Sequence, residues 1–329
     1  MKNTASNTLG RRTVLSLLAV PAMAGRATAQ PAWPDRPVRA LVPFAPGGPA
    51  DVVARLLADT VAAELGQPLV IENRAGAGGN LGAQAAAQAP RDGLTLLVTA
   101  AGPIVINPAL YPNPGYDPVR DFTPISRLAT GPLLLVCNPR LPYRSVADLI
   151  ADAKRRPGQI NFSTGGNGTV PHLATELFLR QAGIEMTHVP FRATPQATQA
   201  VMSGDAAIFF DSPTSMSLVR DGRLRALAVT ATQRFALTPD VPSMPEAGGP
   251  DVSVEAWYAV LAPAGVPAER IARVGAAFAA ATRRPEVVER FASMGFTPVS
   301  EASATFAAAI RKESTRWRDV IRSAGVRIE

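Results

Sequence analysis

Four loops rich in Gly, Ser and Thr contain the residues of this sequence that are best suited to chemistry. Each follows an apolar run typical of a strand and precedes a helix-like segment; the loops span residues 43–51, 99–102, 163–169 and 210–213. In open α/β sheets, ligands bind at loops that follow the carboxyl ends of strands. Glycines there let backbone N–H groups approach an anion, and a following helix N-terminus adds positive potential. The four loops together predict a small-anion site, although any one of them also fits a tight turn with a helix cap.

Nucleotide and metal motifs have little support. The sequence contains no Gly-Lys-Ser/Thr, so it has no phosphate-binding P-loop. The segment Gly76–Gly82 follows a strand, but its third glycine comes one place late for a dinucleotide fingerprint, and no acid stands about 20 residues further on. His172 and His188 are the only histidines, which excludes a His-rich zinc site. We therefore expect no cofactor and no metal.

A serine hydrolase is the main enzymatic alternative. Ser163, His188 and Asp211 could form a triad in chain order, but the glycine two places before the serine in G-x-S-x-G is missing. Asp211 follows a strand and either caps the next helix or orients ligand and water. His172, in the first turn of a helix, is better explained as a structural imidazole. An exported enzyme, either a Ser163-based hydrolase or a cofactor-dependent oxidoreductase, remains the rival hypothesis.

Strand-like runs alternate with helix-period segments, which predicts an α/β fold with parallel sheets covered by helices. Strands are expected at 38–42, 69–71, 94–99, 125–128, 133–137, 160–162, 187–189, 207–210, 224–229 and 253–261. Helices are expected at 51–65, 81–88, 170–182, 196–202, 215–221, 268–282, 286–294 and 301–324, with another opened by the capping pattern Ser145-x-x-Asp148 and ended by Pro157-Gly158. Two αβ units in series, followed by helices alone, suggest a two-lobed, hinged chain.

Composition excludes several classes of protein. In 329 residues, 47% are hydrophobic and 18% are charged, which is incompatible with disorder. Without the four basic residues of the leader described next, 29 basic and 26 acidic residues leave a net charge of +3, too small and too evenly spread for a nucleic-acid partner. Cys137 is the only cysteine and lies in an apolar run, so it predicts a buried thiol in a strand and no disulfide.

The N-terminal segment is typical of a secretory signal. Arg11 and Arg12 stand directly before the apolar run 14–20, and residues 22–24 and 27–29 both fit a small-x-small cleavage site. The paired arginines suit the twin-arginine type. With only about 10 apolar residues against the roughly 20 that span a bilayer, a membrane anchor is disfavoured. We expect a signal peptide at residues 1–29, cleaved near Ala29, and a periplasmic protein that follows it.

An ordered set of motifs resembles the substrate-binding proteins of tripartite tricarboxylate transporters, the Bug family of periplasmic receptors. The resemblance runs from Trp33 to about Gly325. It rests on Trp33-Pro34-x-Arg36-Pro37-Val38, Val42-Pro43-Phe44-Ala45-Pro46-Gly47-Gly48-x-x-Asp51-x-x-Ala54-Arg55, Glu72-Asn73-Arg74-x-Gly76-Ala77-Gly78-Gly79-Asn80-x-Gly82, Asn107-Pro108-x-Leu110-Tyr111, Ser163-x-Gly165-x-Gly168-x-x-x-His172-Leu173, Val189-Pro190-Phe191-Arg192 and Trp257-Tyr258-x-x-x-Ala262-Pro263-x-Gly265. It also offers a second interpretation of Gly76–Gly82, as a structural loop of the family.

The resemblance implies a type II periplasmic-binding-protein fold, in which two αβ lobes joined by a hinge close on a ligand in the cleft between them. Lobe 1 would comprise residues 30–131 plus 255–329, and lobe 2 residues 132–254. The implied protein is not an enzyme. It captures a small organic carboxylate and delivers it to a two-component membrane permease, as a monomer and without nucleic acid. A sensory receptor of the same fold is an alternative that the sequence does not separate from transport.

The candidate ligand-binding residues come from these loops and from the resemblance. In lobe 1 they are Phe44, Ala45, Gly47, Gly48, Asp51 and Ala101; in lobe 2 they are Ser163, Thr164, Gly165, Gly168, Thr169, Phe191, Arg192 and Asp211. The Arg192 fork suits a second carboxylate on the ligand, but a solvated surface arginine is an open alternative. Two residues depart from the family pattern: Ala193 stands where Gly is usual, and Ala207 where Asp is common.

Overall fold

The computed structural model describes residues 1–2 and 33–326, and from Trp33 onward the chain forms one unit. The predicted Arg11-Arg12 pair, the apolar run and both cleavage patterns lie outside the described residues. In the described part, no helix combines the length and the apolar character needed to cross a membrane.

A six-stranded mixed sheet is built from both ends of this unit. Its strand order is β11-β4-β10-β3-β1-β2. The strands are β1 (Val38–Val42), β2 (Leu69–Asn73), β3 (Thr95–Ala100), β4 (Phe122–Pro132), β10 (Glu255–Pro263) and β11 (Thr297–Pro298). Strand β1 pairs in parallel with β2 and β3, whereas β10 runs antiparallel between β3 and β4. Strand β10, from the C-terminal part of the chain, therefore lies in the middle of the sheet that begins with β1, β2 and β3.

Helices cover both faces of this sheet because its strands are apolar on both sides. Ala40 and Leu96 pack in one cluster with residues of α1 (Pro49–Leu65), α8 (Ala268–Arg283) and α9 (Pro285–Ser293). Their neighbours Leu41 and Leu97 face the opposite side, toward α2 (Asn80–Ala87) and α10 (Ser303–Ala324). Successive residues of a strand point to opposite faces, so these unbroken apolar strands require a covering layer on each side.

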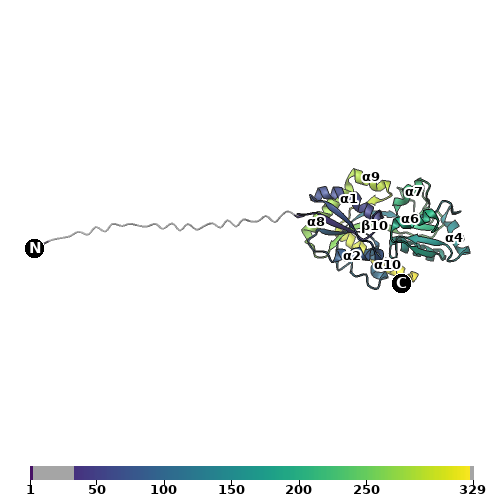
Figure 1. Cartoon of the computed structure of the whole chain (residues 1–329), viewed down its shortest axis with the longest axis horizontal. Helices are drawn as coiled ribbons and strands as arrows, with labels where there is room; N and C mark the ends of the chain where they lie inside the picture. Colours follow the sequence, from purple (N-terminus) through teal and green to yellow (C-terminus); the bar gives the residue numbers. More distant parts are fainter. Residues whose placement is uncertain (3–32, 327–329) are drawn as a thin grey trace. The chain divides into compact units, whose positions relative to one another are not determined.

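A second, five-stranded sheet has the order β7-β6-β8-β5-β9. Its strands are β5 (Leu134–Cys137), β6 (Asn161–Thr164), β7 (Thr187–Pro190), β8 (Ile208–Asp211) and β9 (Arg225–Val229). One face packs against α6 (Thr194–Ser203) and α7 (Met216–Arg220), the other against α4 (Val146–Arg155) and α5 (Val170–Ala182). Figure 1 shows α4, α6 and α7 around this sheet and α1 and α8 around the other.

Two expectations about single residues are confirmed here. Cys137 is fully buried in β5, and burial raises the pKa of its thiol to about 11. Ser145 caps α4, accepting from the Asp148 N–H while the Asp148 carboxylate accepts from the Ser145 N–H, which is the predicted capping box.

The chain crosses between the sheets twice, and Thr230 joins the crossings. One crossing runs directly from β4 to β5, and the other is the segment 230–254 between β9 and β10. The Thr230 hydroxyl accepts from the Leu133 N–H (2.8 Å) and donates to the Val254 carbonyl (2.5 Å). These points lie close to the expected lobe boundaries at 131/132 and 254/255; the division into two moving lobes itself stays a prediction.

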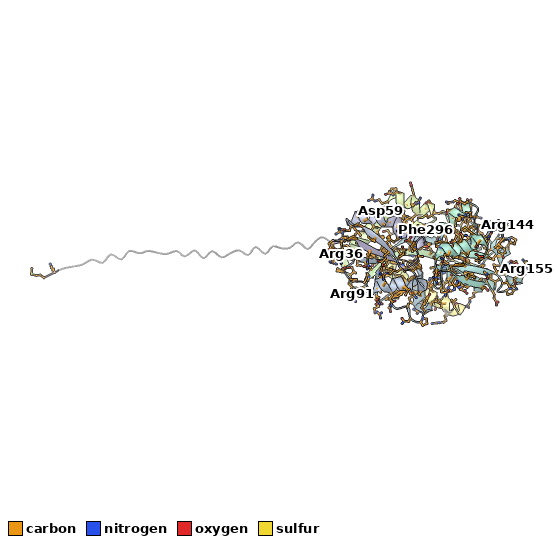
Figure 2. The ribbon with its side chains drawn as sticks, in the orientation of Figure 1. Arg36, Asp59, Arg91, Arg144, Arg155 and Phe296 are labelled. Atoms are coloured by element: carbon orange, nitrogen blue, oxygen red, sulfur yellow. The ribbon has the colours of Figure 1, made fainter. Side chains whose placement is uncertain are left out.

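Charged side chains are spread over the surface of the described unit. Figure 2 labels Arg36, Asp59 and Arg91 at the periphery near the six-stranded sheet and Arg144 and Arg155 near the other. Phe296, by contrast, is fully buried.

The α/β prediction is confirmed by the two layered sheets. Five short elements were not predicted: turns of 3-10 helix at Ala77–Gly79 and Pro213–Ser215, a π-helical turn at Gly102–Ile106, α3 (Asn107–Leu110) and β11. Each is too short to show a repeating apolar period.

Candidate functional site

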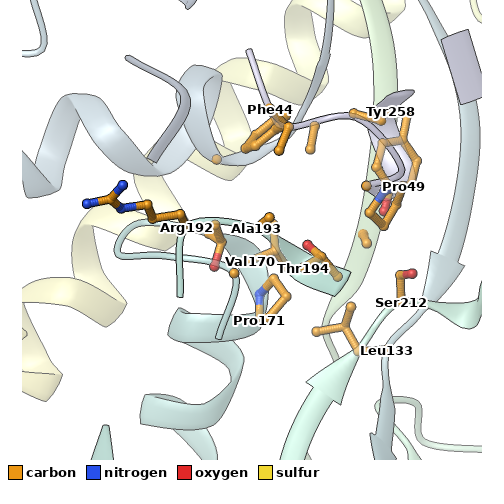
Figure 3. A pocket seen from close by; sticks show the side chains of 18 residues that line it. Phe44, Pro49, Leu133, Val170, Pro171, Arg192, Ala193, Thr194, Ser212 and Tyr258 are labelled. Atoms are coloured by element: carbon orange, nitrogen blue, oxygen red, sulfur yellow. The ribbon is translucent and has the colours of Figure 1, made fainter. Parts of the chain in front are cut away.

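A cavity lies between the two sheets and is partly open to solvent; about 60 Å³ of it is accessible to water. Its lining draws on both sheets and is largely apolar, as Figure 3 shows; it consists of Phe44, Ala45, Gly48, Pro49, Ala50, Ala100, Gly102, Leu133, Gly165, Thr169, Val170, Pro171, Arg192, Ala193, Thr194, Ser212, Ala256 and Tyr258. Each of the four loops identified in the sequence contributes to this lining. Among these lining residues, Arg192 is the only charged one.

Three α-helices begin at the cavity wall. Helix α1 starts after Gly48, α5 after Thr169 and α6 after Ala193, and all three of these residues line the cavity. Each N-cap has extended backbone angles, and each helix has a proline at its first or second position. Proline fixes φ at a helical value, and it loses no helical hydrogen bond there because the first N–H groups of a helix have no acceptor within the helix. None of the three N-caps makes a side-chain capping bond. Unsatisfied N–H groups and the positive ends of three helix dipoles therefore meet at one cavity, which suits an anion.

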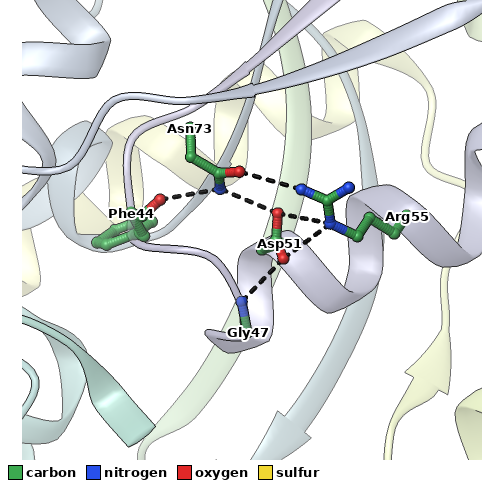
Figure 4. Close-up of polar contacts among 5 residues, drawn as sticks. All are labelled: Phe44, Gly47, Asp51, Arg55 and Asn73. Atoms are coloured by element: carbon green, nitrogen blue, oxygen red, sulfur yellow. Dashed lines mark hydrogen bonds and ion pairs between the residues drawn. The ribbon is translucent and has the colours of Figure 1, made fainter. Parts of the chain in front are cut away.

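The loop that leads into α1 is held by a buried carboxylate. Asp51 accepts from the Gly47 N–H (2.9 Å), from Arg55 Nε (2.9 Å) and from Asn73 Nδ2 (2.9 Å), as Figure 4 shows. Asn73 Nδ2 also donates to the Phe44 carbonyl (3.0 Å). Burial by itself raises the pKa of Asp51, but these hydrogen bonds and the charge of Arg55 outweigh it and lower the pKa overall. The carboxylate thus fixes the loop instead of lining the cavity.

Two stacked histidines support the loop 163–169 from behind. The rings of His172 and His188 lie 4.4 Å apart. His188 Nε2 pairs with the Thr164 hydroxyl (2.7 Å), and His172 Nδ1 accepts from the Gly168 N–H (3.4 Å). Burial lowers the pKa of His188 to about 4; burial and then the charge of His188 lower that of His172 to about 3. Both imidazoles are therefore neutral near pH 7, which confirms the structural role expected for His172.

Asp211, Ser212 and Tyr258 lie at the end of the site away from Arg192. Asp211 is only 2% exposed and accepts from the Thr198 hydroxyl (2.7 Å) and the Ser212 N–H (2.7 Å). Burial raises its pKa to about 7 despite these two bonds. Ser212 and Tyr258 line the cavity directly, and Figure 3 shows both on the side away from Arg192.

The structure brings six of the fourteen candidate residues into the cavity lining: Phe44, Ala45, Gly48, Gly165, Thr169 and Arg192. Gly47 and Asp211 line an adjoining hollow that shares Pro49 and Thr194 with the cavity, and Phe191 lines a surface groove.

The other five candidates lie behind the wall. Asp51 and Thr164 take part in the networks above. The Ser163 hydroxyl is fully buried and donates to the Ala197 carbonyl (3.0 Å), and Ala101 is packed in the core. Gly168 packs so tightly that a Cβ there would lie 2.2 Å from Asn107 Oδ1.

The remaining lining residues were missed for different reasons. Some lie inside the predicted loops but were not chosen as candidates; they are Pro49, Ala50, Ala100, Gly102 and Ser212. Others directly follow a predicted segment: Val170 and Pro171 follow the loop 163–169, and Ala193 and Thr194 follow Phe191-Arg192. Leu133, Ala256 and Tyr258 lie on or beside strands and belong to none of the four loops. Tyr258 stands in a quoted family motif, but that motif did not mark it as a lining residue.

Two residues singled out from the sequence have clear placements. Ala193 adopts φ −151° and ψ 147°, a conformation open to alanine, and its methyl group lines the cavity where glycine would leave space. Arg192 is exposed, and Figure 3 shows its guanidinium pointing away from Tyr258 and Pro49. This favours the solvated alternative for Arg192.

The geometry disfavours the enzymatic alternatives. Ser163, His188 and Asp211 have separate partners, so no triad is assembled. Gly76–Gly82 is a packing loop: the Gly78 carbonyl accepts from Asn107 Nδ2 (3.0 Å), and a Cβ on Gly78 would lie 2.3 Å from the Asn167 carbonyl oxygen. Within the described part of the chain, no group of three or more His, Cys, Asp or Glu is arranged to hold a metal ion.

Comparison with known proteins decides the family. The sequence profile described as "Tripartite tricarboxylate transporter family receptor" matches residues 53–326. Protein BugT of Bordetella pertussis (strain Tohama I) is 37% identical over 299 residues, which cover 90% of this chain and 92% of BugT. The chain belongs to this receptor family.

Solved structures agree with the assignment. A protein of R. palustris solved with adipate is 34% identical to this receptor, with a TM-score of 0.87, and covers 90% of this chain and 99% of its own. MatC from Rhodopseudomonas palustris, solved with bound malate, is 35% identical with a TM-score of 0.84 and covers 88% and 100%. The expected type II periplasmic-binding-protein fold is confirmed. The receptors of this family bind solutes in the periplasm and catalyse no reaction, so this chain is a binding protein and not an enzyme.

Proposed function

We propose that this receptor captures a small organic carboxylate in the cavity between its sheets and delivers it to a two-component membrane permease. One observation carries the proposal: α1, α5 and α6 all begin, without side-chain caps, at the wall of a single apolar cavity. A carboxylate can accept from N–H groups at these helix ends and be stabilised by the three helix dipoles, while an apolar body contacts the largely apolar lining.

Closure of the two lobes completes the proposed cycle. Residues 30–131 plus 255–329 would move against residues 132–254 about the two crossings that Thr230 ties together. Hinge closure around a ligand is a common device of binding proteins, and its pivots are a few residues at element ends. The closed form would present the ligand to the permease. The receptor is proposed to act as a monomer, which light scattering at micromolar concentration would check.

A thermal-shift screen tests the function. The protein from Gln30 onward is heated with a panel of mono-, di- and tricarboxylates, and with nicotinamide nucleotides as a control. A ligand at about 100 times its Kd should stabilise the fold by about 2.7 kcal/mol. Stabilisation by a few related acids is the expected result. A shift from a nucleotide with none from any acid would overturn the proposal.

Export through residues 1–29 is a separate proposal that rests on the sequence. The mass of the protein recovered from the periplasm should correspond to a chain that begins at Gln30. Replacement of both Arg11 and Arg12 by lysine should block export by a twin-arginine route. A protein exported equally well with both lysines would show that another route is used.

A further inference from the structure

The helix ends around the cavity differ in charge. The first turn of α1 contains the carboxylate of Asp51, whereas the first turns of α5 and α6 contain no acidic residue. A carboxylate in the first turn offsets the positive end of its own helix. The start of α6 lies close to another carboxylate, because Thr198 of α6 donates to Asp211 and Thr194 lines a hollow together with Asp211. A bound anion is therefore favoured beside α5, where Gly165 and Thr169 line the cavity.

The other end of the cavity is poorly suited to a second anion. Asp211 lies buried behind it, and the carboxylate accepts only from neutral groups, the Thr198 hydroxyl and the Ser212 N–H. In the described residues, no arginine, lysine or histidine forms an ion pair with Asp211. A second carboxylate placed here would be repelled by the ionised form of Asp211 in a poorly solvated environment.

Tyr258 supplies a donor at this same end. The residue is 4% exposed and lines the cavity, and its hydroxyl is not among the fully buried side-chain groups that lack a hydrogen-bond partner in residues 33–326. The hydroxyl therefore remains accessible from the cavity. Burial, and then the charge of Asp211, raises the pKa of Tyr258, so the phenol keeps its proton. A protonated phenol that reaches the cavity can donate to an acceptor on the ligand in place of water.

The phenol ring is held rigidly. Tyr258 lies in the central strand β10, opposite Ala100 of β3 and Ala129 of β4. Its ring packs edge-on against Phe296, with centroids 5.3 Å apart. The pairing of β10 with β4 slips by a residue directly after Tyr258. Such bulges re-aim side chains and are over-represented beside binding sites.

We propose that Tyr258 donates a hydrogen bond to a neutral oxygen of the ligand, a hydroxyl or a carbonyl, at the far end from the carboxylate. The preferred ligand class is then a singly charged acid with a neutral polar tail, and a matching dicarboxylate binds more weakly. This inference rests on the proposed function and adds to it the identity of the selecting residue and the charge of the ligand.

Matched acids test the inference. Affinities are measured by calorimetry for hexanoate, 6-hydroxyhexanoate and adipate, and for butanoate, 4-hydroxybutanoate and succinate. In each series only the far group changes, from methyl to hydroxyl to carboxylate. The hydroxy acid should bind about tenfold more tightly than either companion, the effect of one satisfied hydrogen bond. Tyr258→Phe should remove this advantage and leave the affinity for the plain monocarboxylate within about twofold.

Tyr143→Phe is the matched control, because it removes a buried hydroxyl that bonds Asp152 and does not line the cavity. It should leave every affinity unchanged. Tighter binding of the dicarboxylate, or an equal loss for all acids in Tyr258→Phe, overturns the inference but leaves the receptor function intact. If no acid of these series or of the wider panel binds, both the inference and the proposed function are refuted.

Discussion

Replacement of Asp211 by asparagine should change how the stability of this receptor depends on pH. The substitution is sterically conservative, and Asn Oδ1 can still accept from the Ser212 N–H. The Thr198 hydroxyl, which now donates to Asp211, can turn to the Thr194 carbonyl 3.1 Å away and accept from the new amide. The variant should therefore fold, with the ionisable proton removed.

The size of the effect follows from the pKa shift. Burial raises the pKa of Asp211 from 3.8 to about 7. Between these values the folded state holds a proton that the unfolded state has lost, so stability falls as pH rises and levels off above about pH 7. Of the range from about pH 5 to pH 8, the folded protein keeps the proton, and the unfolded chain lacks it, over about two pH units, from about pH 5 to about pH 7. At roughly 1.4 kcal/mol per unit, the wild type should lose about 2–3 kcal/mol relative to Asp211→Asn.

Urea unfolding of both proteins at several pH values measures this difference. The comparison with the variant is necessary because His172 and His188 act in the opposite direction: their folded-state pKa values are lowered, so their contribution to stability grows with pH in the same range. These contributions cancel when the two free energies of unfolding are subtracted. A difference that stays constant from about pH 5 to pH 8 would refute the buried, unpaired state assigned to Asp211.

Three further substitutions probe the walls of the cavity. Gly165→Val should abolish carboxylate binding with the far-UV circular dichroism unchanged, since a Cβ there would lie 2.8 Å from Thr194 Oγ1 and 3.1 Å from its backbone N; wild-type affinity would remove this loop from the site. Arg192→Ala should weaken adipate and hexanoate equally, by less than about threefold, because the side chain is exposed; a selective loss for adipate would instead pair Arg192 with a second carboxylate. Asp51→Asn should cost about 1–3 kcal/mol in urea unfolding, because the charge that pairs with Arg55 and one of the two oxygens that accept from Gly47, Arg55 and Asn73 are lost; unchanged stability would contradict its role in fixing the loop.

Local patterns in the sequence determined the elements and the position of the binding loops. The apolar period of residues 170–182 predicts a helix, and α5 spans Val170–Ala182. The four Gly-, Ser- and Thr-rich loops each supply lining residues, such as Phe44, Gly102, Gly165 and Ser212. These features follow from short-range physics, because glycine, proline and apolar periodicity act on the backbone within a few residues.

Only the tertiary structure decided which side chains face the ligand. Ser163, Thr164, Asp51 and Asp211 have the chemistry of ligand donors or acceptors, yet each is bonded inside the fold. Tyr258 lies in a family motif on a predicted strand, outside the binding loops, and only the return of β10 to the six-stranded sheet brings it to the cavity. A buried polar group must find a partner, and whether that partner is a neighbouring strand, a helix or the ligand depends on contacts between residues distant in sequence.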